Sequence, residues 1–241
     1  MTGAHPTLPA LETPGIATRA FALASIVGAT GLVVLHGVRL FAASDALSWW
    51  AVPVVLLGMA TADFLSGVVH WGADTWGSET MPVLGKRLLH PFRVHHINPA
   101  DFLRRHWIDT NGDVATIVVI ALGSAFLIPT GSVMGRAVLL FVIALCATTL
   151  PTNQVHQWAH MRNPPQWVAR LQRAGVLLGG SQHAMHHDPP YLTNYCIALG
   201  WCNPLLVRLR LFQRMERLVT RITGAKPRAD EERLASLAAH I

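Results

Sequence analysis

The sequence predicts an all-α integral membrane protein with four transmembrane helices, capped on the cytosolic side by a histidine-rich site for two metals and by amphipathic interfacial helices. Three observations lead to this fold class. Of the 241 residues, 51% are hydrophobic and only 13% are charged, whereas about a quarter of the residues in a soluble domain are charged. Four apolar runs are long enough to cross a bilayer. Most of the 13 histidines lie in short polar segments next to these runs.

The net charge and the cysteines show which partners and which kinds of cysteine site the sequence does not indicate. The formal net charge of +6 comes from 19 Lys and Arg against 13 Asp and Glu. In a membrane protein such a bias reflects topology and anionic lipid, and no base-reading motif indicates nucleic acid as a partner. Cys146, Cys196 and Cys202 are odd in number and lack CxxC spacing, so the sequence indicates neither a disulfide framework nor a zinc knuckle.

The chain divides into a lead-in, one membrane domain and a cytosolic tail, over residues 1–18, 19–223 and 224–241. The lead-in is rich in proline and lacks periodicity, so we expect it to be disordered or interfacial. The first span covers about residues 20–43, which is longer than the apolar region of a signal peptide. His36 and Arg39 near its far end are interpreted as a lone polar residue and a cation that reaches the interface.

The second span covers about residues 49–71 and contains one acid, Asp63. An acid inside a membrane helix is costly, so it is functional or paired. If the helix continues to Asp74, then Asp63, His70 and Asp74 share one face. His70 is then a candidate metal ligand. Asp74 is either a ligand or the acceptor that orients an imidazole, and the deeper Asp63 is a hydrogen-bond partner of a ligand or a structural residue.

Residues 72–112 are polar and interrupted by turns, and the doublet His95-His96 is their most informative part. Adjacent residues on a helix point about 100° apart. The two histidines could therefore bind two different metals, one each. Alternatively, one could bind a metal while its neighbour supports it. His90 and His106 are weaker candidates, because extra histidines near a site often serve as hydrogen-bond partners of the ligands.

The third and fourth spans follow the polar segment. Residues 110–113 (TNGD) predict a turn and an N-cap before the third span, at about residues 114–130. The fourth span covers about residues 133–155, and Pro151 should kink or end its membrane portion. The turns after Pro151 carry the i, i+4 pair His156 and His160, with Asn153 on roughly the same side.

The C-terminal third contains the densest histidine motif. Residues 167–178 predict an amphipathic interfacial helix, and residues 204–222 predict a second one, with an apolar stripe opposite five arginines. A packed cytosolic helix is the alternative for the second. Between them, His183, His186 and His187 stand at i, i+3 and i+4, so all three project from one face of a short helix that Pro189-Pro190 ends.

The distribution of basic residues predicts the topology, because cytoplasmic loops carry the excess of Lys and Arg. Five of the 19 basic residues lie within residues 72–112 and eleven follow His160. The long loop and both termini are therefore expected on the cytosolic side. Four spans then place all the histidine segments on that same side, at a similar depth.

Eight histidines are the primary candidates for metal ligands: His70, His95, His96, His156, His160, His183, His186 and His187. Eight imidazoles are more than the ligands of one tetrahedral zinc site, and this number is typical of a site for two metals. Iron, copper and zinc are all possible as these metals. The sequence shows no Ser-His-Asp arrangement, no glycine-rich phosphate loop and no HExxH motif. Hydrolysis and nucleotide chemistry are therefore not indicated.

These motifs resemble the lipid desaturase family of Kua and CarF type. The resemblance covers roughly residues 60–232 and rests on six ordered segments: residues 70–77 (HWGADTWG), 91–96 (PFRVHH), 110–113 (TNGD), 153–160 (NQVHQWAH), 183–187 (HAMHH) and 226–230 (KPRAD). The segments at 76, 110–113 and 226–230 are closer to the plasmalogen-forming members than to the plant members. The chain departs from the animal members around His90 and at Arg105-His106-Trp107.

The resemblance implies a membrane oxidoreductase that uses two iron ions, O₂ and two electrons to form the vinyl ether of a plasmalogen. The double bond would lie between carbons 1 and 2 of the alkyl chain of plasmanylethanolamine. The eight histidines are the implied ligands, Asp74, Asn153, Asp63 and His106 are supporting residues or further ligands, and no other catalytic or cofactor-binding side chain is expected. The electrons would come from a separate donor of cytochrome b5 or ferredoxin type.

Two alternatives remain open at this stage. The plant relatives imply an acyl-lipid desaturase, or a hydroxylase, that uses the same metal site. A metal-binding or signalling membrane protein without catalytic activity is the alternative from another class, but a transporter should spread ionisable groups through the bilayer. Arg93, Arg104 and Arg105 could contact the lipid phosphate, or they could be ordinary positive-inside residues.

Overall fold

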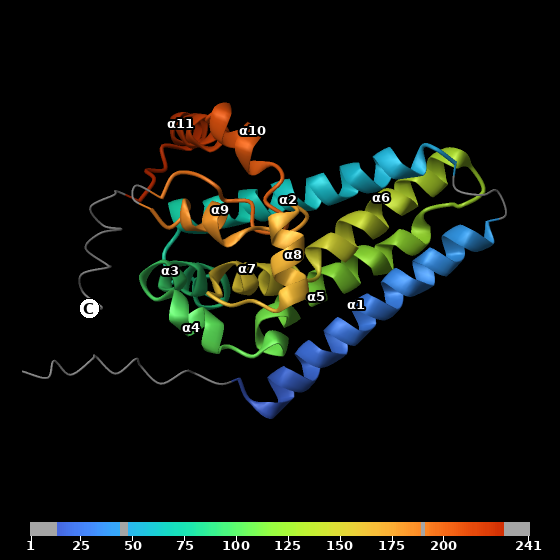
Figure 1. Ribbon diagram of the computed structural model, residues 1–241, viewed down its shortest axis with the longest axis horizontal. Coiled ribbons are helices and arrows are strands. Elements are labelled where there is room, and N and C mark those ends of the chain that lie inside the picture. Colours follow the sequence, from blue (N-terminus) through green and yellow to red (C-terminus); the bar gives the residue numbers. More distant parts are fainter. Residues whose placement is uncertain (1–13, 44–47, 189–190, 229–241) are drawn as a thin grey trace, which may run out of the picture.

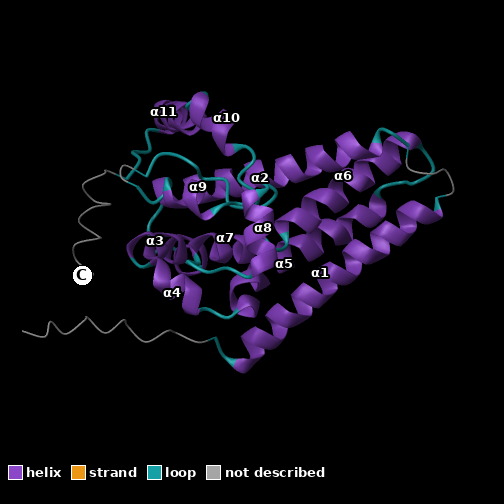
Figure 2. Ribbon diagram, in the orientation of Figure 1, coloured by secondary structure: helices purple, strands orange, loops and turns teal. Residues whose placement is uncertain are grey.

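The four apolar helices lie side by side along the long axis of the molecule, and short helices gather at one end of this bundle (Figure 1, Figure 2). The computed structural model describes residues 14–43, 48–188 and 191–228, and these are helical with no strand. The described residues do not include residues 1–13, Pro189-Pro190 and residues 229–241. Parts of the predictions for the lead-in, for the end of the histidine-bearing helix and for the C-terminal tail fall on these residues.

The prediction of an all-α fold with four candidate membrane spans is confirmed. The spans are α1 (Ile16–Ala42), α2 (Ala51–Thr75), α5 (Trp107–Ser124) with the short helix η2 (Ala125–Leu127), and α6 (Val133–Thr149) followed by α7 (Thr152–His160). Each is long and apolar enough to cross a membrane. Pro151 interrupts the fourth span between α6 and α7, as predicted, because proline removes a helical hydrogen bond and clashes with the preceding turn.

The third span begins earlier than predicted, because α5 starts at Trp107 instead of after Asp113. His106 is the N-cap, and its Nδ1 accepts a hydrogen bond from the backbone N–H of Ile108 at 3.3 Å. Gly112 lies inside the helix, and its missing side chain lets α1 approach, because a Cβ at this position would overlap the Cβ of Ala22. The turn-like residues 110–113 therefore serve close helix packing.

Side chains of α1 connect it to both ends of α5. Arg19 donates two hydrogen bonds to the carboxylate of Asp109 in the first turn of α5, at 3.0 and 2.6 Å. At the other end, Nε2 of His36 lies 2.8 Å from the carbonyl oxygen of Leu122, and Arg39 donates to that of Ala125 at 3.4 Å. The last carbonyls of a helix have no partner within it. His36 and Arg39 therefore hold the end of α1 against the end of the third span, and the interfacial position of Arg39 stays a prediction.

Gly58 allows α2 and α6 to approach each other closely. A Cβ at Gly58 would lie 2.7 Å from the carbonyl oxygen of Phe141 and 2.8 Å from the Cβ of Ala144. Small residues at such crossings permit the backbone contacts that hold membrane helices together.

We expect Gly58→Val to lower the free energy of unfolding by about 1–3 kcal/mol, the usual effect of overpacking. The measurement is the unfolding midpoint in detergent. Gly72→Ala on the same helix is the matched control, because a Cβ there meets nothing within 4 Å. Equal midpoints for the two variants would contradict the proposed role of the α2–α6 contact.

Short helices lie at the end of the bundle where α2 terminates. Between the second and third spans these are η1 (Gly85–Leu89), α3 (His90–Ile97) and α4 (Pro99–Arg104), and after the fourth span they are α8 (Gln166–Arg173), α9 (Gly180–Ala184), α10 (Asn203–Arg208) and α11 (Leu211–Thr223). The single helix predicted over residues 204–222 is in fact α10 and α11. Arg210, with φ of 48°, separates the two. This turn lets α11 pack Phe212 against Trp71 and Tyr195.

Candidate metal centre

Two adjoining groups of metal-binding side chains lie at this end of the bundle. We call the first the five-histidine group (His95, His156, His160, His183 and His187) and the second the Asp74 group (His70, Asp74, His96 and His186). Within each group, one ligand atom of every residue lies within 4.8 Å of those of the others. Their side chains come from α2, α3, α7 and α9 with the turn after it, so segments far apart in the sequence meet here.

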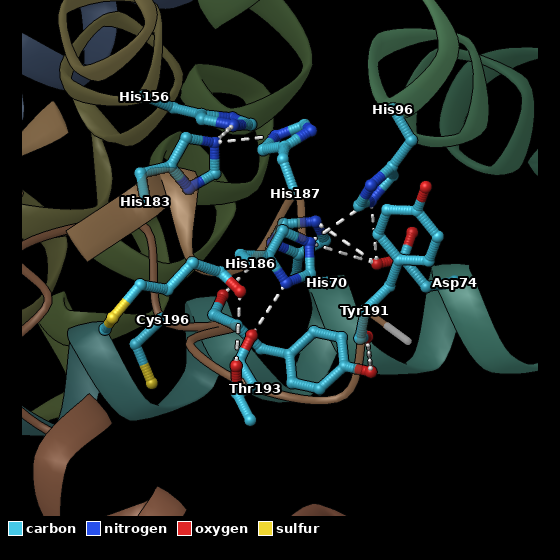
Figure 3. A network of polar contacts seen from close by, with 12 residues as sticks. His70, Asp74, His96, His156, His183, His186, His187, Tyr191, Thr193 and Cys196 are labelled. Atoms are coloured by element: carbon cyan, nitrogen blue, oxygen red, sulfur yellow. Dashed lines mark hydrogen bonds and ion pairs between the residues drawn. The ribbon is translucent and has the colours of Figure 1, made fainter. Parts of the chain in front are cut away.

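His183 is central to the five-histidine group. Its Nε2 lies 2.8 Å from Nε2 of His156, 2.8 Å from Nε2 of His160 and 3.1 Å from Nε2 of His187. Figure 3 shows His156, His183 and His187 directed toward one another. A ring nitrogen carries at most one proton, so hydrogen bonds cannot satisfy all three contacts at once. A cation among the lone pairs can.

Asp74 is central to the second group. Its Oδ2 lies 3.3 Å from Nε2 of His70, 3.2 Å from Nε2 of His96 and 3.5 Å from Nε2 of His186 (Figure 3). The two groups adjoin each other, since the rings of His95 and His96 are 4.5 Å apart. The second group differs chemically from the first because it contributes one carboxylate charge.

The protonation state of the histidines fits metal binding. Burial, followed by neighbouring imidazoles, holds the pKa of His95 and that of His183 well below the usual value. The rings are therefore neutral near pH 7, which is the form that binds metals. Nε2 of His95 is buried without a hydrogen-bond partner, and a metal would supply one. Imidazole with one carboxylate suits iron, copper or zinc.

Backbone carbonyls orient two imidazoles of the Asp74 group. Nδ1 of His70 lies 3.1 Å from the carbonyl oxygen of Tyr195, and Nδ1 of His186 lies 2.8 Å from that of Thr193. A carbonyl can only accept, so both Nδ1 atoms carry the proton and each Nε2 presents its lone pair to the group. No sequence pattern predicts this role of residues 193–195, because every residue has a backbone carbonyl.

Asp63 does not join either group but holds the loop that carries these carbonyls. Its Oδ1 accepts from the backbone N–H of Leu199 at 2.7 Å and of Gly200 at 2.8 Å, and its Oδ2 accepts from that of Cys202 at 2.8 Å. The buried acid in α2 is therefore paired with three amides of a distant loop. Its role is structural, one of the two roles that the sequence left open.

The histidine doublet and triplet each divide between the two groups. His95 belongs to the five-histidine group and His96 to the Asp74 group, which is the first of the two arrangements considered for the doublet. The triplet divides in the same way, with His186 apart from His183 and His187. The prediction that all three share one helix face is wrong, because α9 ends at Ala184 and His186 lies in the turn that follows.

Four other candidates lie outside the two groups. His106 caps α5, and Asn153 donates to the carbonyl of Thr110, which ties α7 to α5. His90 contacts the exposed Glu79. Arg93 is buried and donates to the carbonyls of Trp76 and Gly77, both at 2.9 Å. Arg93 therefore holds a turn, and its contact with lipid phosphate stays an untested prediction.

Aromatic side chains border the two groups. The ring of Phe102 lies 4.9 Å from that of His156, and the ring of Phe92 lies 4.9 Å from that of His70. The ring of Tyr195 lies 5.7 Å from that of His70. These rings exclude water from part of the centre. Sequence reasoning missed them because isolated aromatic residues are typical of any core.

Comparison with known proteins identifies the family. Residues 59–230 match the family model described as the lipid desaturase domain. The chain is 40% identical over 215 residues to the plasmanylethanolamine desaturase of Myxococcus xanthus, covering 89% of this chain and 76% of the relative. It is 41% identical over 197 residues to plasmanylethanolamine desaturase 1 of Mus musculus, covering 78% and 73%.

A third relative is the chloroplastic fatty acid desaturase 4 of Arabidopsis thaliana, which is 35% identical over 181 residues, 73% of this chain and 53% of the relative. No solved structure gives a significant match. The family model covers most of the chain and contains every residue of both metal-binding groups. The chain therefore belongs to the lipid desaturase family.

Proposed function

We propose that this protein is a plasmanylethanolamine desaturase with two iron ions. It would introduce the vinyl ether double bond between carbons 1 and 2 of the alkyl chain of an ether phospholipid. The observation that carries the proposal is the pair of adjoining groups, eight imidazoles and one carboxylate, at one end of four apolar helices. The two relatives named plasmanylethanolamine desaturase support the choice of substrate.

The five-histidine group would hold one iron and the Asp74 group the other. When bound, the two irons supply the activation of O₂ that the removal of hydrogen from an unactivated carbon requires. The side chains hold their positions around this chemistry. His70 and His186 keep their Nδ1 protons on the carbonyls of Tyr195 and Thr193, so both Nε2 atoms stay available. Phe92 and Phe102 limit the access of water.

The balance of the reaction requires an outside source of electrons. The lipid loses two hydrogens, and O₂ takes these together with two electrons and two protons from outside to give two water molecules. We expect a separate carrier of cytochrome b5 or ferredoxin type to supply the electrons. The distribution of Lys and Arg supports a cytosolic location for the centre and for both termini. The exposed Arg104 and the half-buried Arg105 are candidates for contacting the lipid phosphate.

The test is the lipid composition of a host that contains ether phospholipids and lacks vinyl ethers. Expression of this chain should produce acid-labile vinyl ethers, and expression of the His183→Ala variant should not. Changed acyl unsaturation without vinyl ethers would instead support the acyl-lipid alternative, to which the Arabidopsis relative points. Unchanged lipids, with intact protein and bound iron in the membrane, would contradict both.

A further inference from the structure

The outward face of α11 carries three exposed arginines. Arg214, Arg217 and Arg221 line one open hollow together with Leu218. All three arginines are exposed, and no carboxylate of the described residues lies within ion-pair distance of them. We call these three residues the arginine face.

Three of the other described arginines lie close to acids. Arg19 pairs with Asp109, Arg87 lies 3.8 Å from Asp113, and Arg93 lies 3.8 Å from Glu79. Exposed like charges close together on a helix repel one another, so these three arginines do not stabilise α11 through their charge. Planar guanidinium groups bind carboxylates in pairs of hydrogen bonds. The arginine face is therefore complementary to an acidic surface.

The inward face of α11 leads directly to the Asp74 group. Phe212 is 4% exposed, and its ring lies 5.0 Å from the ring of Tyr195. The ring of Tyr195 in turn lies 4.9 Å from that of His186 and 5.7 Å from that of His70. Two aromatic side chains in series, Phe212 and Tyr195, thus connect the inward face of α11 to two histidines of the metal centre.

We propose that the arginine face is the docking surface for an acidic one-electron carrier protein. This inference rests on the proposed function, which needs two electrons from outside the chain. Two carriers in succession each lose one electron to the metal centre, across Phe212 and Tyr195. The required protons come from solvent. Charge attraction accelerates the encounter, and Phe212 and Tyr195 form the contact between α11 and the metal centre.

The test compares the full iron-loaded protein with its Arg214→Gln/Arg217→Gln/Arg221→Gln variant in nanodiscs of neutral phosphatidylcholine. Anaerobic stopped-flow measurements follow the reduction of the iron by a reduced, acidic cytochrome b5. At low ionic strength the variant should react about 10- to 100-fold more slowly than the wild type. Photoreduction by a small deazaflavin should be equal for both. Added salt should slow the wild type and leave the variant almost unchanged.

The matched control is Arg170→Gln/Arg173→Gln, which removes exposed arginines from α8 and should reduce at the wild-type rate. Equal rates for the α11 variant and the wild type would overturn the docking proposal. So would a defect seen only in nanodiscs with anionic lipid, since the arginine face would then bind the membrane surface. If deazaflavin finds no reducible iron in the wild type, the proposed function itself fails.

Discussion

Replacing His183 by alanine is expected to empty one of the two metal sites and to abolish desaturation. Nε2 of His183 lies within 3.1 Å of the Nε2 atoms of three other histidines. No other ring of the five-histidine group has as many such contacts. Losing a hydrogen-bond partner of a ligand typically lowers metal affinity about 10- to 100-fold, and losing the central ligand should cost more. The measurement is iron per chain, which should fall from two to one, together with vinyl ether formation.

His186→Ala is the complementary variant, because His186 belongs to the Asp74 group. It should also lose one iron and all activity, and the remaining iron should be the one that His183→Ala releases. The double variant should then hold none. Membrane insertion should be unchanged in all three, since the apolar spans are intact.

His106→Ala is the control for both variants. His106 is exposed and caps α5, so its loss should affect helix stability by about 1 kcal/mol at most and leave both irons in place. Loss of both irons from either single variant would show that the two groups form one cooperative site. Full activity of His183→Ala would remove the five-histidine group from the mechanism.

The spans were predictable because hydropathy depends on composition and length, which the sequence contains directly. The predicted boundaries of the spans were less accurate where packing between helices determines where a helix begins or ends. Residues 110–113 have the composition of a turn but lie inside α5, where Gly112 permits close packing against Ala22 of α1. Arg210 has no turn signature either, and its left-handed conformation is accounted for by the seating of Phe212 below α11.

The convergence of the histidine segments was predictable from charge and span number, but their division into groups was not. Neighbouring histidines such as His95 and His96 point apart on a helix, and only the positions of the other elements determine which group each one joins. The position of the charged side chain of Arg93 could not be predicted from the sequence either. Its burial against the turn at Trp76 and Gly77 depends on how α3 packs, which no spacing in the sequence records.

Asp63→Leu is expected to give the largest loss of stability among single substitutions outside the two metal-binding groups. The carboxylate is fully buried and accepts three backbone hydrogen bonds from residues 199–202. An unsatisfied buried N–H costs about 1–3 kcal/mol, so the loss should reach about 3 kcal/mol or more. Asp63→Asn should fall between Leu and the wild type, because its amide keeps one acceptor oxygen. The unfolding midpoint in detergent measures this order.

The same substitution should affect one metal site more than the other. Residues 199–202 continue directly from Thr193 and Tyr195, whose carbonyls orient His186 and His70, while no residue of the five-histidine group bonds to this loop in the described structure. At a temperature where Asp63→Asn is still folded, iron should therefore leave the Asp74 group first. Asp113→Asn is the control, because its side chain is 62% exposed and surface pairs contribute about 0–1 kcal/mol. Equal retention of both irons in Asp63→Asn would show that the loop does not position these histidines.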